Sequence, residues 1–435
     1  MKSIIRAGLL VAGALGGVSF FACTKSDTVV PTEPIREPQL TTASLRSEVG
    51  EADSHTEALA SPRWQRTAAA LVALNKVAPC AAARQLAFVG VAQYWAVQRA
   101  DHGDDGRRAD DRGGRSRSTS DRGAVAGASV VVLSYLFPLQ GQALEDSVVA
   151  QRSAGSESAQ RAFARAEAIG RAVGATIVSR AQTDGWATPF TGTIPVGAGF
   201  WHSELTPPSV ACGQLPGVLP WFLTSGSQFR SAPPPAFGSQ AFQTALTEIR
   251  SLSDTRTHTQ DSIATFWALG TGTPTASGFW LQVATDGISQ HGLSERRATH
   301  LYALLSATMA DAAIGCWDTK EVYWLIRPWQ ADPLIKVVAA VGKPNHSSYV
   351  SGHSCVSSSA AAVLSTFFPQ RRAQLDAMVT EAGLSRMYGG IHYRFDIEGG
   401  QLLGRSVAAF AIAADRSGHS VLTLDNDNED DDRDR

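Results

Sequence analysis

Long stretches of this chain carry alanine with larger apolar residues at intervals of three and four, whereas strand-like alternation is scarce throughout. Such spacing places the apolar side chains on one face of a helix. With 435 residues, of which 44% are hydrophobic, the chain can bury a large core in one domain or in two packed halves. We therefore predict an all-α fold. The predicted helices are residues 64–78, 82–99, 124–137, 155–182, 239–252, 257–269, 276–289, 293–315, 353–367, 371–383 and 397–414.

Two segments interrupt this helical pattern. Residues 101–123 are charged and rich in glycine, which is typical of an exposed, disordered loop. Residues 186–238 contain Trp186, Trp201 and Trp221 among many prolines and glycines, with little periodicity. We predict that this second segment crosses the surface of the helical body in an extended conformation, held there by its aromatic side chains.

The N-terminus predicts export. Lys2 and Arg6 precede an apolar run at residues 7–22, which is short for a membrane span and suits the core of a signal peptide. Cys23 follows this run directly, so residues 1–23 resemble the signal of a bacterial lipoprotein, cleaved before Cys23 and acylated on it. A lipoprotein anchored in the periplasm or outer membrane, a secreted protein and a retained anchor are all compatible with these residues.

The remaining chain divides into three parts. Residues 24–60 are polar and carry prolines, which predicts a disordered tether. Residues 61–420 form the predicted helical domain, with an anion-binding core at 310–415, and residues 421–435 form a charged, disordered tail. A formal net charge of −2 gives no indication of a nucleic-acid partner. Beyond the N-terminal run, no segment is long and apolar enough to span a bilayer, so a lipid on Cys23 is the only membrane contact that the sequence indicates.

Four cysteines follow Cys23, and their spacing matches no metal site. Cys316 and Cys355 lie among apolar or small residues, which favours buried thiols. An exported protein can oxidise a pair of cysteines to a disulfide, but the spacing of Cys80, Cys212, Cys316 and Cys355 does not indicate which pair.

Three short segments near the C-terminus carry the groups that bind an oxyanion. The first is Lys320-x6-Arg327-Pro328. Seven residues are nearly two helical turns, so we expect both cationic side chains to project from one face of a helix that runs to about Leu325. Pro328 favours the end of a helix at this point.

The second segment, Ser351-Gly352-His353, precedes a helical run rich in alanine and serine. Ser351 is a suitable N-cap, and Gly352 allows the backbone to come close to a ligand. The amides at the start of a helix attract anions, and His353 would lie where it can exchange a proton with a bound oxygen. Alone, this segment is more typical of an ordinary capped helix with a surface histidine.

The third segment is Ser385-Arg386-x5-His392-x3-Asp396, a glycine-rich loop between an arginine and a histidine. If the chain is helical after His392, Asp396 can accept a hydrogen bond from the ring nitrogen of His392 that faces away from the ligand. This bond would fix the tautomer of His392 and raise the basicity of its free nitrogen. The three segments together supply three cations, two imidazoles, a hydroxyl and a carboxylate, which suits phosphate or vanadate.

In this order the segments resemble the signature of the superfamily of type 2 phosphatidic acid phosphatases and vanadium-dependent haloperoxidases: K-x6-RP, PSGH and SR-x5-H-x3-D. Every charged or catalytic position of the signature is matched, and Val350 stands where the signature has proline. A looser resemblance to bacterial vanadium haloperoxidase-like proteins extends over residues 60–415. It implies an all-α fold with two halves, each similar to a four-helix bundle.

The resemblance also implies roles for individual residues. His392 would be the axial ligand of vanadium or, in a phosphatase, the nucleophile that accepts the phosphoryl group. His353 would be the acid–base residue, and Asp396 would orient His392. The residues that would hold the oxygens of the anion are Lys320, Arg327, Ser351, Gly352 and Arg386.

The same residues support two reactions. In a haloperoxidase the cofactor is vanadate, Lys320 polarises the peroxide, and a halide is oxidised to hypohalous acid. A phosphatase has no resident cofactor: His392 attacks a phosphomonoester and His353 protonates the leaving oxygen. Trp317 lies one turn before Lys320, and His346 lies seven residues before His353; both positions resemble those beside the halide site of haloperoxidases.

We therefore predict a vanadate-dependent peroxidase that uses hydrogen peroxide to oxidise a halide or a similar nucleophile. A soluble acid phosphatase is the first alternative, and an exported binding protein with a degenerate site is the second. The absence of about six membrane spans argues against an integral lipid phosphatase. The sequence indicates neither the halide, the organic substrate nor the oligomeric state.

Overall fold

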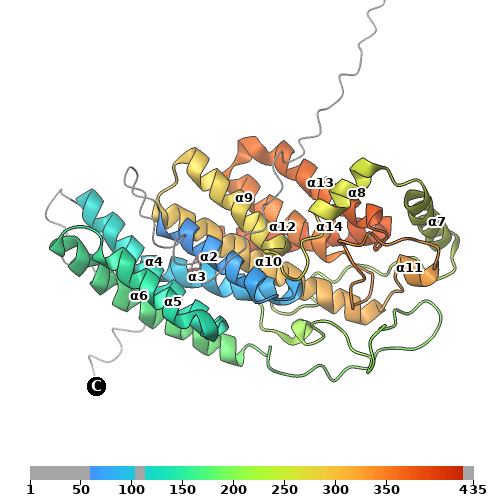
Figure 1. Ribbon diagram of the computed structural model, residues 1–435, viewed down its shortest axis with the longest axis horizontal. Coiled ribbons are helices and arrows are strands. Elements are labelled where there is room, and N and C mark those ends of the chain that lie inside the picture. The colour runs from blue at the N-terminus through green and yellow to red at the C-terminus, as the bar shows by residue number, and fades with distance from the viewer. Residues whose placement is uncertain (1–58, 103–112, 425–435) are drawn as a thin grey trace, which may run out of the picture. The chain divides into compact units, whose positions relative to one another are not determined.

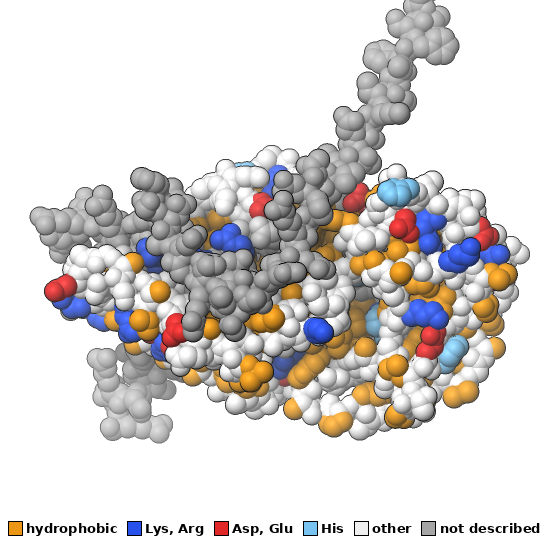
Figure 2. All heavy atoms as spheres, in the orientation of Figure 1, with side chains coloured by type: hydrophobic (Ala, Val, Ile, Leu, Met, Phe, Trp, Pro, Cys, Tyr) orange, Lys and Arg blue, Asp and Glu red, His pale blue; other side chains and the backbone are white. Residues whose placement is uncertain are grey.

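The computed structural model describes residues 59–102 and 113–424, and within these ranges it contains helices and no β-strand (Figure 1). The predicted all-α fold is therefore confirmed. The predicted signal at residues 1–23, almost all of the tether at 24–60 and the end of the tail lie outside the described residues. None of the described helices has the length and apolar character needed to cross a membrane. On the face shown in Figure 2, positive and negative side chains are interspersed.

Thirteen α-helices lie in the described ranges, together with short 3₁₀ helices at three connections. The α-helices are α2 (Ala60–Leu74), α3 (Pro79–His102), α4 (Gly113–Leu136), α5 (Gly141–Ser153), α6 (Glu157–Thr183), α7 (Gln240–Asp254), α8 (His258–Phe266), α9 (Thr275–His291), α10 (Glu295–Tyr323), α11 (Pro328–Ala331), α12 (Gly352–Phe367), α13 (Arg372–Tyr388) and α14 (Arg394–Arg416). The 3₁₀ helices are η2 (Pro138–Gln140), η3 (Leu215–Gly217) and η4 (Pro369–Arg371).

The helices form two groups that share α10. Helices α3, α4, α5 and α6 pack together in one group, and α12, α13 and α14 pack together in the other (Figure 1). Helix α10 contacts α3 and α4 on one side and α12 and α14 on the other. Its 29 residues span about 44 Å, and 22 of them are buried. This central helix therefore delivers its C-terminal end, which carries Lys320, to the interior of the second group.

The expected loop at residues 101–123 is partly wrong. Helix α4 already begins at Gly113, and residues 103–112 lie outside the described part of the chain. The beginning of α4 has little apolar periodicity, but α4 packs closely along α6: a Cβ at Gly123 would lie 2.3 Å from the carbonyl oxygen of Phe163. Tertiary packing here overrides a weak local helix propensity.

A close approach of α14 to α12 brings the second and third motif segments together. A Cβ on Gly404 of α14 would lie 2.2 Å from the carbonyl oxygen of Cys355, and one on Gly400 would lie 2.7 Å from that of Ser351. Only glycine permits backbones to approach this closely. The N-terminal ends of α12 and α14 therefore lie side by side, with Ser351 N donating to Asp396 O at 2.9 Å.

Residues 184–239, which we call the strap, contain no α-helix and run along the ends of several helices, as the sequence predicts (Figure 1). The disulfide Cys80–Cys212 ties the strap to the start of α3 and answers the open question of pairing. Further along the chain, Trp201 N donates to Trp324 O at 2.7 Å, and Ile326 N donates to Gly199 O at 2.9 Å. The strap thereby holds the segment that leads from α10 to Arg327.

The side chain of Asp311, buried in the middle of α10, anchors the strap at a second point. Its carboxylate accepts the backbone N–H groups of Trp221, Phe222 and Leu223 at 2.8, 2.7 and 3.1 Å. Burial nevertheless raises the pKa of Asp311 to about 6, because desolvation outweighs these hydrogen bonds. At this point the strap therefore depends on a single buried carboxyl group.

The packed part of the chain reaches beyond the predicted end of the domain at residue 420. Leu422 is 1% exposed, and its carbonyl oxygen accepts a hydrogen bond from Gln98 Nε2 at 3.0 Å. The beginning of the predicted tail therefore packs against α3.

We predict that Asp311→Ala destabilises the protein by about 3 kcal/mol, because three buried backbone N–H groups lose their acceptor. The matched control is Asp318→Ala on the same helix, which removes a half-exposed ion pair with Arg230 of the strap. This control should cost less than about 1 kcal/mol. Urea denaturation at neutral pH measures both changes, and equal losses in the two variants would contradict the role assigned to Asp311.

Candidate active site

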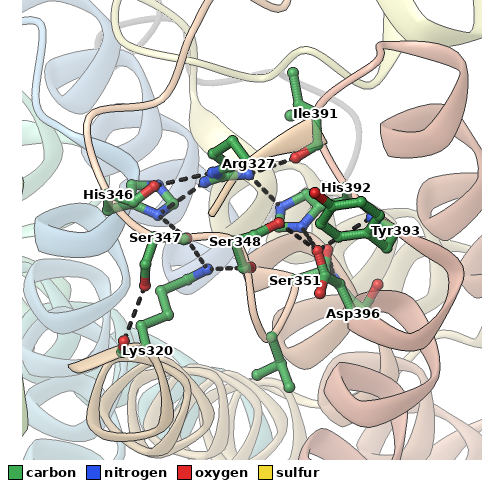
Figure 3. Close-up of polar contacts among 12 residues, drawn as sticks. Lys320, Arg327, His346, Ser347, Ser348, Ser351, Ile391, His392, Tyr393 and Asp396 are labelled. Atoms are coloured by element: carbon green, nitrogen blue, oxygen red, sulfur yellow. Dashed lines mark hydrogen bonds and ion pairs between the residues drawn. The ribbon is translucent and has the colours of Figure 1, made fainter. Parts of the chain in front are cut away.

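Four stretches of chain meet in the second group of helices and bring the motif residues together (Figure 3). They are the C-terminal end of α10 with the segment that follows it to Arg327, the loop at residues 345–351, the C-terminal end of α13 and the start of α14. The residues gathered there are among the most deeply buried polar side chains of the described chain: Lys320, Arg327, Ser351, Arg386, His392 and Asp396.

His392 and Asp396 form a buried pair at the start of α14. His392 precedes the helix, and Asp396 lies in its first turn, so the chain folds back and places His392 Nδ1 2.8 Å from Asp396 Oδ2. The same oxygen accepts from Ser348 Oγ at 2.5 Å and from Tyr393 N at 3.1 Å. Because the carboxylate accepts at Nδ1, His392 carries its proton there and its Nε2 carries the lone pair.

Arg327 contacts this lone pair, but the backbone that carries Arg327 is not helical as predicted. Lys320 and Arg327 do not share a helical face, because α10 ends at Tyr323 and Trp324 adopts a left-handed conformation, with φ 47°. Arg327 then lies in extended backbone, with ψ 153°. The chain reverses at Trp324, so the two cations approach the site from different directions.

The guanidinium of Arg327 links two histidines. Its Nη1 lies 3.1 Å from His392 Nε2 and 2.7 Å from Ile391 O, while its Nη2 lies 3.0 Å from His346 Nδ1. A guanidinium only donates, so both ring nitrogens accept and both imidazoles are neutral. With Nε–H donating to His346 O at 2.9 Å, one N–H of Arg327 has no acceptor among the described residues.

Lys320 is held by the loop that follows Asn345. Its Nζ donates to the carbonyl oxygens of Ser347 and Ser348, each at 2.9 Å, and Ser347 Oγ donates to Lys320 O at 2.9 Å. An ammonium has three N–H donors, so one remains for another acceptor. Ser347 and Ser348 were not predicted to belong to the site. Their position directly after His346 and before the second motif could have indicated them.

Arg386 lies in the last turn of α13, not in a loop as predicted, and points to the end of α8. Its Nη2 donates to Ala264 O at 3.1 Å, and its Nε donates to Ser385 Oγ at 2.9 Å. Ala264 is among the last residues of α8, where carbonyl groups lack helical partners and attract cations. Three N–H groups of Arg386 remain without an acceptor in the described chain.

His353 lies in the first turn of α12, where Ser351 is the N-cap as predicted. Ser351 Oγ accepts from Ser354 N at 3.3 Å. The amides of Gly352 and His353 have no acceptor among the described residues, as is usual at the start of a helix. His353 Nε2 is buried and likewise has no partner among those residues. A ligand at this helix end would therefore meet two N–H donors and one imidazole nitrogen.

Burial shifts the pKa of every charged group in the site toward its neutral form. Desolvation lowers the pKa of Lys320 to about 8 and that of Arg386 to about 9, and it raises the pKa of Asp396 to about 6. Desolvation, followed by the neighbouring cations, holds the pKa of His392 and of His353 well below 6.5. Positive charge accumulates here without sufficient compensation, so the site favours an anion.

Trp317 and His346 lie at the same end of the site. Their ring centroids are 5.0 Å apart, and the centroid of the Trp317 ring is 5.8 Å from Lys320 Nζ. Trp317 Nε1 donates to Ala211 O in the strap at 2.9 Å. The structure therefore brings both predicted neighbours of the halide site to Lys320 and Arg327.

A cavity of about 400 Å³ opens onto this cluster. The predicted site residues that line it are Trp317, His346, Gly352, His353, Arg386 and His392. Lys320, Arg327, Ser351 and Asp396 lie behind this wall, and the side chain of Ser351 caps α12. The predicted anion-binding and catalytic residues, which we call the cage, thus form a layer that lines the cavity and a second layer that supports it.

Cys316 and Cys355 are free and buried, as predicted, and they lie beside the cage. Cys316 Sγ lies 3.6 Å from Val350 O. No group of three or more histidine, cysteine or acidic side chains arranged for a metal ion is present among the described residues.

The available donors suit a tetrahedral oxyanion. Lys320, Arg327 and Arg386 each keep at least one N–H without an acceptor among the described residues, and the helix start adds two amides. The lone pair of His392 Nε2 accepts from Arg327 Nη1 in this structure, and a ligand of His392 would replace that hydrogen bond. Phosphate and vanadate both carry enough negative charge and acceptor oxygens to satisfy this set.

Comparison with known proteins agrees with this geometry. The model of the PAP2 superfamily matches residues 299–417. Among solved structures, the first bacterial vanadium-dependent iodoperoxidase is similar, with a TM-score of 0.67 and 23% identity over 81% of this chain and 96% of that chain. Comparison with curated protein sequences finds no match.

Bacterial vanadium-dependent chloroperoxidase is also similar in both reported forms. The apo form gives a TM-score of 0.61 with 13% identity, over 79% of this chain and 93% of that chain. The holo form gives 0.59 with 12% identity, over 89% of this chain and 97% of that chain. The resemblance suggested by the motifs is therefore confirmed: residues 299–417, which carry the motifs, match the PAP2 superfamily model, and the chain has the fold of the bacterial vanadium haloperoxidases.

We predict that the site binds sulfate and that its affinity falls as the pH rises above about 8. Binding of a dianion requires the charged form of Lys320, whose pKa is about 8 in the free site, so affinity is full below this value and declines above it. Sulfate keeps its charge over this range. Calorimetric titrations from about pH 6 to about pH 10 measure the effect.

Lys320→Met should weaken sulfate binding roughly ten- to a hundredfold, because it removes a hydrogen bond between charged partners. It should also remove most of the decline above about pH 8. The control is Lys343→Met, which changes an exposed lysine at the cavity mouth that pairs with Glu204. A Lys320→Met variant that titrates like the wild type would show that Lys320 does not face the anion.

Proposed function

We propose that this protein is a vanadate-dependent peroxidase that oxidises a halide or a similar nucleophile with hydrogen peroxide. The observation that carries this proposal is the position of His392 Nε2. It is an unprotonated imidazole nitrogen, fixed by Asp396 and facing Arg327, in a wall that also contains His353 and Arg386. Such an arrangement provides one nitrogen ligand and several N–H donors to an oxyanion.

The similarity to solved structures supports the peroxidase over the phosphatase. The similar structures are an iodoperoxidase and a chloroperoxidase, both vanadium-dependent, and the similarity extends over most of this chain. The neighbouring rings of Trp317 and His346 add a site for a polarisable ion or peroxide beside Lys320.

Each residue of the cage would have a defined part in binding vanadate. His392 Nε2 would supply a nitrogen ligand, and the unused N–H groups of Lys320, Arg327 and Arg386 would hold the oxygens of the vanadate. The amides at the start of α12 would donate to it as well. Bound vanadate would supply the Lewis-acid chemistry that activates hydrogen peroxide toward two-electron oxidation.

His353 would move the proton. Its low pKa keeps the imidazole neutral, and its Nε2 has no partner among the described residues, so it can accept a proton from incoming hydrogen peroxide. It then returns the proton to the departing oxygen. The overall reaction for a halide X⁻ is X⁻ + H₂O₂ + H⁺ → HOX + H₂O, in which the O–O bond breaks and the halide loses two electrons.

We also propose that the protein is exported. The apolar run and Cys23 predict this, and the disulfide Cys80–Cys212 adds support, because disulfides form and persist mainly outside the reducing cytosol. Attachment through a lipid on Cys23 is part of the same proposal.

Phosphomonoester hydrolysis is the second candidate, because the PAP2 superfamily model matches the segment that carries the cage. In that reaction, His392 Nε2 would attack phosphorus and His353 would protonate the leaving oxygen. The anion in the site would then be the phosphate group of the substrate, which reacts, instead of a vanadate that stays bound.

One pair of assays distinguishes the two functions. The protein without residues 1–23 is incubated with orthovanadate, and peroxide-dependent oxidation of iodide and bromide is measured. Hydrolysis of p-nitrophenyl phosphate is measured without vanadate. Halide oxidation supports the peroxidase, and hydrolysis that vanadate inhibits supports the phosphatase. A protein that does neither would contradict both and leave a binding protein.

We predict that His392→Ala abolishes turnover, because the imidazole nitrogen that would bind vanadate is lost. His353→Ala should lower kcat by about two to four orders of magnitude, while vanadate affinity changes by less than about tenfold, since His353 carries the proton and not the anion. The control is His419→Ala, an exposed histidine beyond α14. Full turnover in His392→Ala would refute the assignment of the site.

A further inference from the structure

Two free thiols lie together beside the cage. Cys316 belongs to α10 and Cys355 to the start of α12, and both side chains are completely buried. The two thiols are hydrogen-bonded to each other, and Cys316 Sγ also lies 3.6 Å from the carbonyl oxygen of Val350. Neither anion binding nor the proposed reaction uses these thiols, so the pair needs an explanation of its own.

The pair lies directly behind residues that line the cavity. Gly352 lines the cavity, and a Cβ added to this glycine would lie 3.9 Å from Cys316 Sγ. Trp317, the neighbour of Cys316 in the chain, lines the cavity as well. A molecule of the size of hydrogen peroxide therefore has to pass only one layer of residues to reach this thiol from the cavity.

The surroundings give the two thiols different reactivity. Burial holds the pKa of the Cys355 thiol well above its usual value. At Cys316 burial acts in the same direction, but the hydrogen bond from Cys355 and the positive charges of Lys320 and Arg327 outweigh it, so the pKa of Cys316 is lowered. A thiol with a lowered pKa beside a second thiol is the arrangement of redox-active cysteine pairs, in which the first reacts and the second resolves.

A bond between these sulfurs would join two elements that carry different parts of the cage. Cys316 lies one helical turn before Lys320 on α10, and Cys355 lies two residues after His353 on α12. The sulfurs of a disulfide are about 2.05 Å apart, which is shorter than a hydrogen bond between thiols. Formation of the bond would therefore draw the start of α12 toward α10, and with it the amides of Gly352 and His353 that face the anion site.

We propose that Cys316 and Cys355 are a site of oxidative modification, at which hydrogen peroxide forms a disulfide that weakens anion binding in the cage. Cys316 first becomes a sulfenic acid, R–SH + H₂O₂ → R–SOH + H₂O. Cys355 then attacks this sulfur, R–SOH + R′–SH → R–S–S–R′ + H₂O. In total each sulfur loses one electron, the O–O bond breaks, and peroxide is reduced to water.

This modification goes beyond the proposed function and does not require turnover. Hydrogen peroxide is the oxidant of the proposed peroxidase, so the cavity would expose the pair to it during the reaction. A rising concentration of peroxide would then lower the occupancy of the anion site. The tests below use added peroxide and sulfate binding, and their outcome is therefore independent of whether the protein oxidises halides.

The first test follows the thiols in the chain without residues 1–23, which retains four of the five cysteines. Protein treated with peroxide is denatured, alkylated without reduction and digested for mass spectrometry. The peptides that contain Cys316 and Cys355 should be linked to each other, while Cys80–Cys212 stays unchanged. Two thiols that remain free for alkylation, in protein that binds sulfate, would overturn the inference. A pair that is already linked after purification supports it, and dithiothreitol then provides the reduced form.

Two single variants test which thiol reacts first. In Cys355→Ser the resolving thiol is absent, so peroxide should leave a sulfenic acid on Cys316 that dimedone traps. Cys316→Ser should give at least about tenfold less adduct on Cys355, because the thiolate fraction falls about tenfold for each unit by which the pKa rises. Equal amounts of adduct on the two cysteines would overturn the assignment of Cys316 as the reacting thiol.

The second test measures the effect on the cage by calorimetric titration with sulfate. The oxidised wild type should bind sulfate at least about tenfold more weakly than the reduced form, since a displacement of about 1 Å has consequences of this order at a site. The matched control is the double variant Cys316→Ser/Cys355→Ser, which keeps side chains of similar size and the disulfide Cys80–Cys212. Its affinity should change by less than about twofold under the same treatments.

A rise in melting temperature on addition of sulfate shows that the cage of the double variant is intact, and Cys316→Ala/Cys355→Ala replaces a serine pair that does not fold. An equal loss of affinity in the double variant would mean that peroxide acts on other residues. Unchanged affinity in a wild type whose two cysteines are linked would mean that the disulfide does not reach the anion site. Either result would overturn the proposed effect of the disulfide on the cage.

Discussion

The interior of this protein contains three cationic side chains with one carboxylate between them, and the rest of the site follows from this imbalance. Burying a charge without a partner is unfavourable. Lys320, Arg327 and Arg386 are each less than 3% exposed, and Asp396 is already engaged by His392 and Ser348. Burial, followed by the nearby cations, lowers the pKa of both His353 and His392 and keeps them neutral. The imbalance of charge leaves an oxyanion as the group that would relieve it.

Backbone carbonyl oxygens at helix ends and in loops hold the cations of this cluster. Lys320 is held by the carbonyl groups of Ser347 and Ser348, and Arg386 by the last turn of α8. Ends of helices and loops have carbonyl groups without helical partners, so they can solvate a cation without adding a charge. The close contact of α14 with α12 and the attachment of the strap to the end of α10 are what bring these ends together.

The sequence predicted the residues of the site better than the way in which they reach it. The spacing of His392 and Asp396 correctly indicated a hydrogen bond, because four residues at a helix start allow few other arrangements. The spacing of Lys320 and Arg327 suggested a shared helical face, but Trp324 ends the helix in a left-handed conformation that no local pattern announced. Ser348 escaped notice because its role depends on a contact with Asp396, 48 positions away.

The residues around the site also differ in how easily a sequence reveals them. The cage residues lie at helix ends, where motifs with fixed spacing make them recognisable in a sequence. The wall of the cavity also contains Ala276 near the start of α9 and Ala313 of α10, whose importance comes only from the side chains that they do not have. Substitution at Ala276 or Ala313 changes the volume of the cavity and leaves the charged residues of the site unchanged. The shape of the cavity can therefore vary between related sequences without any change in the motifs.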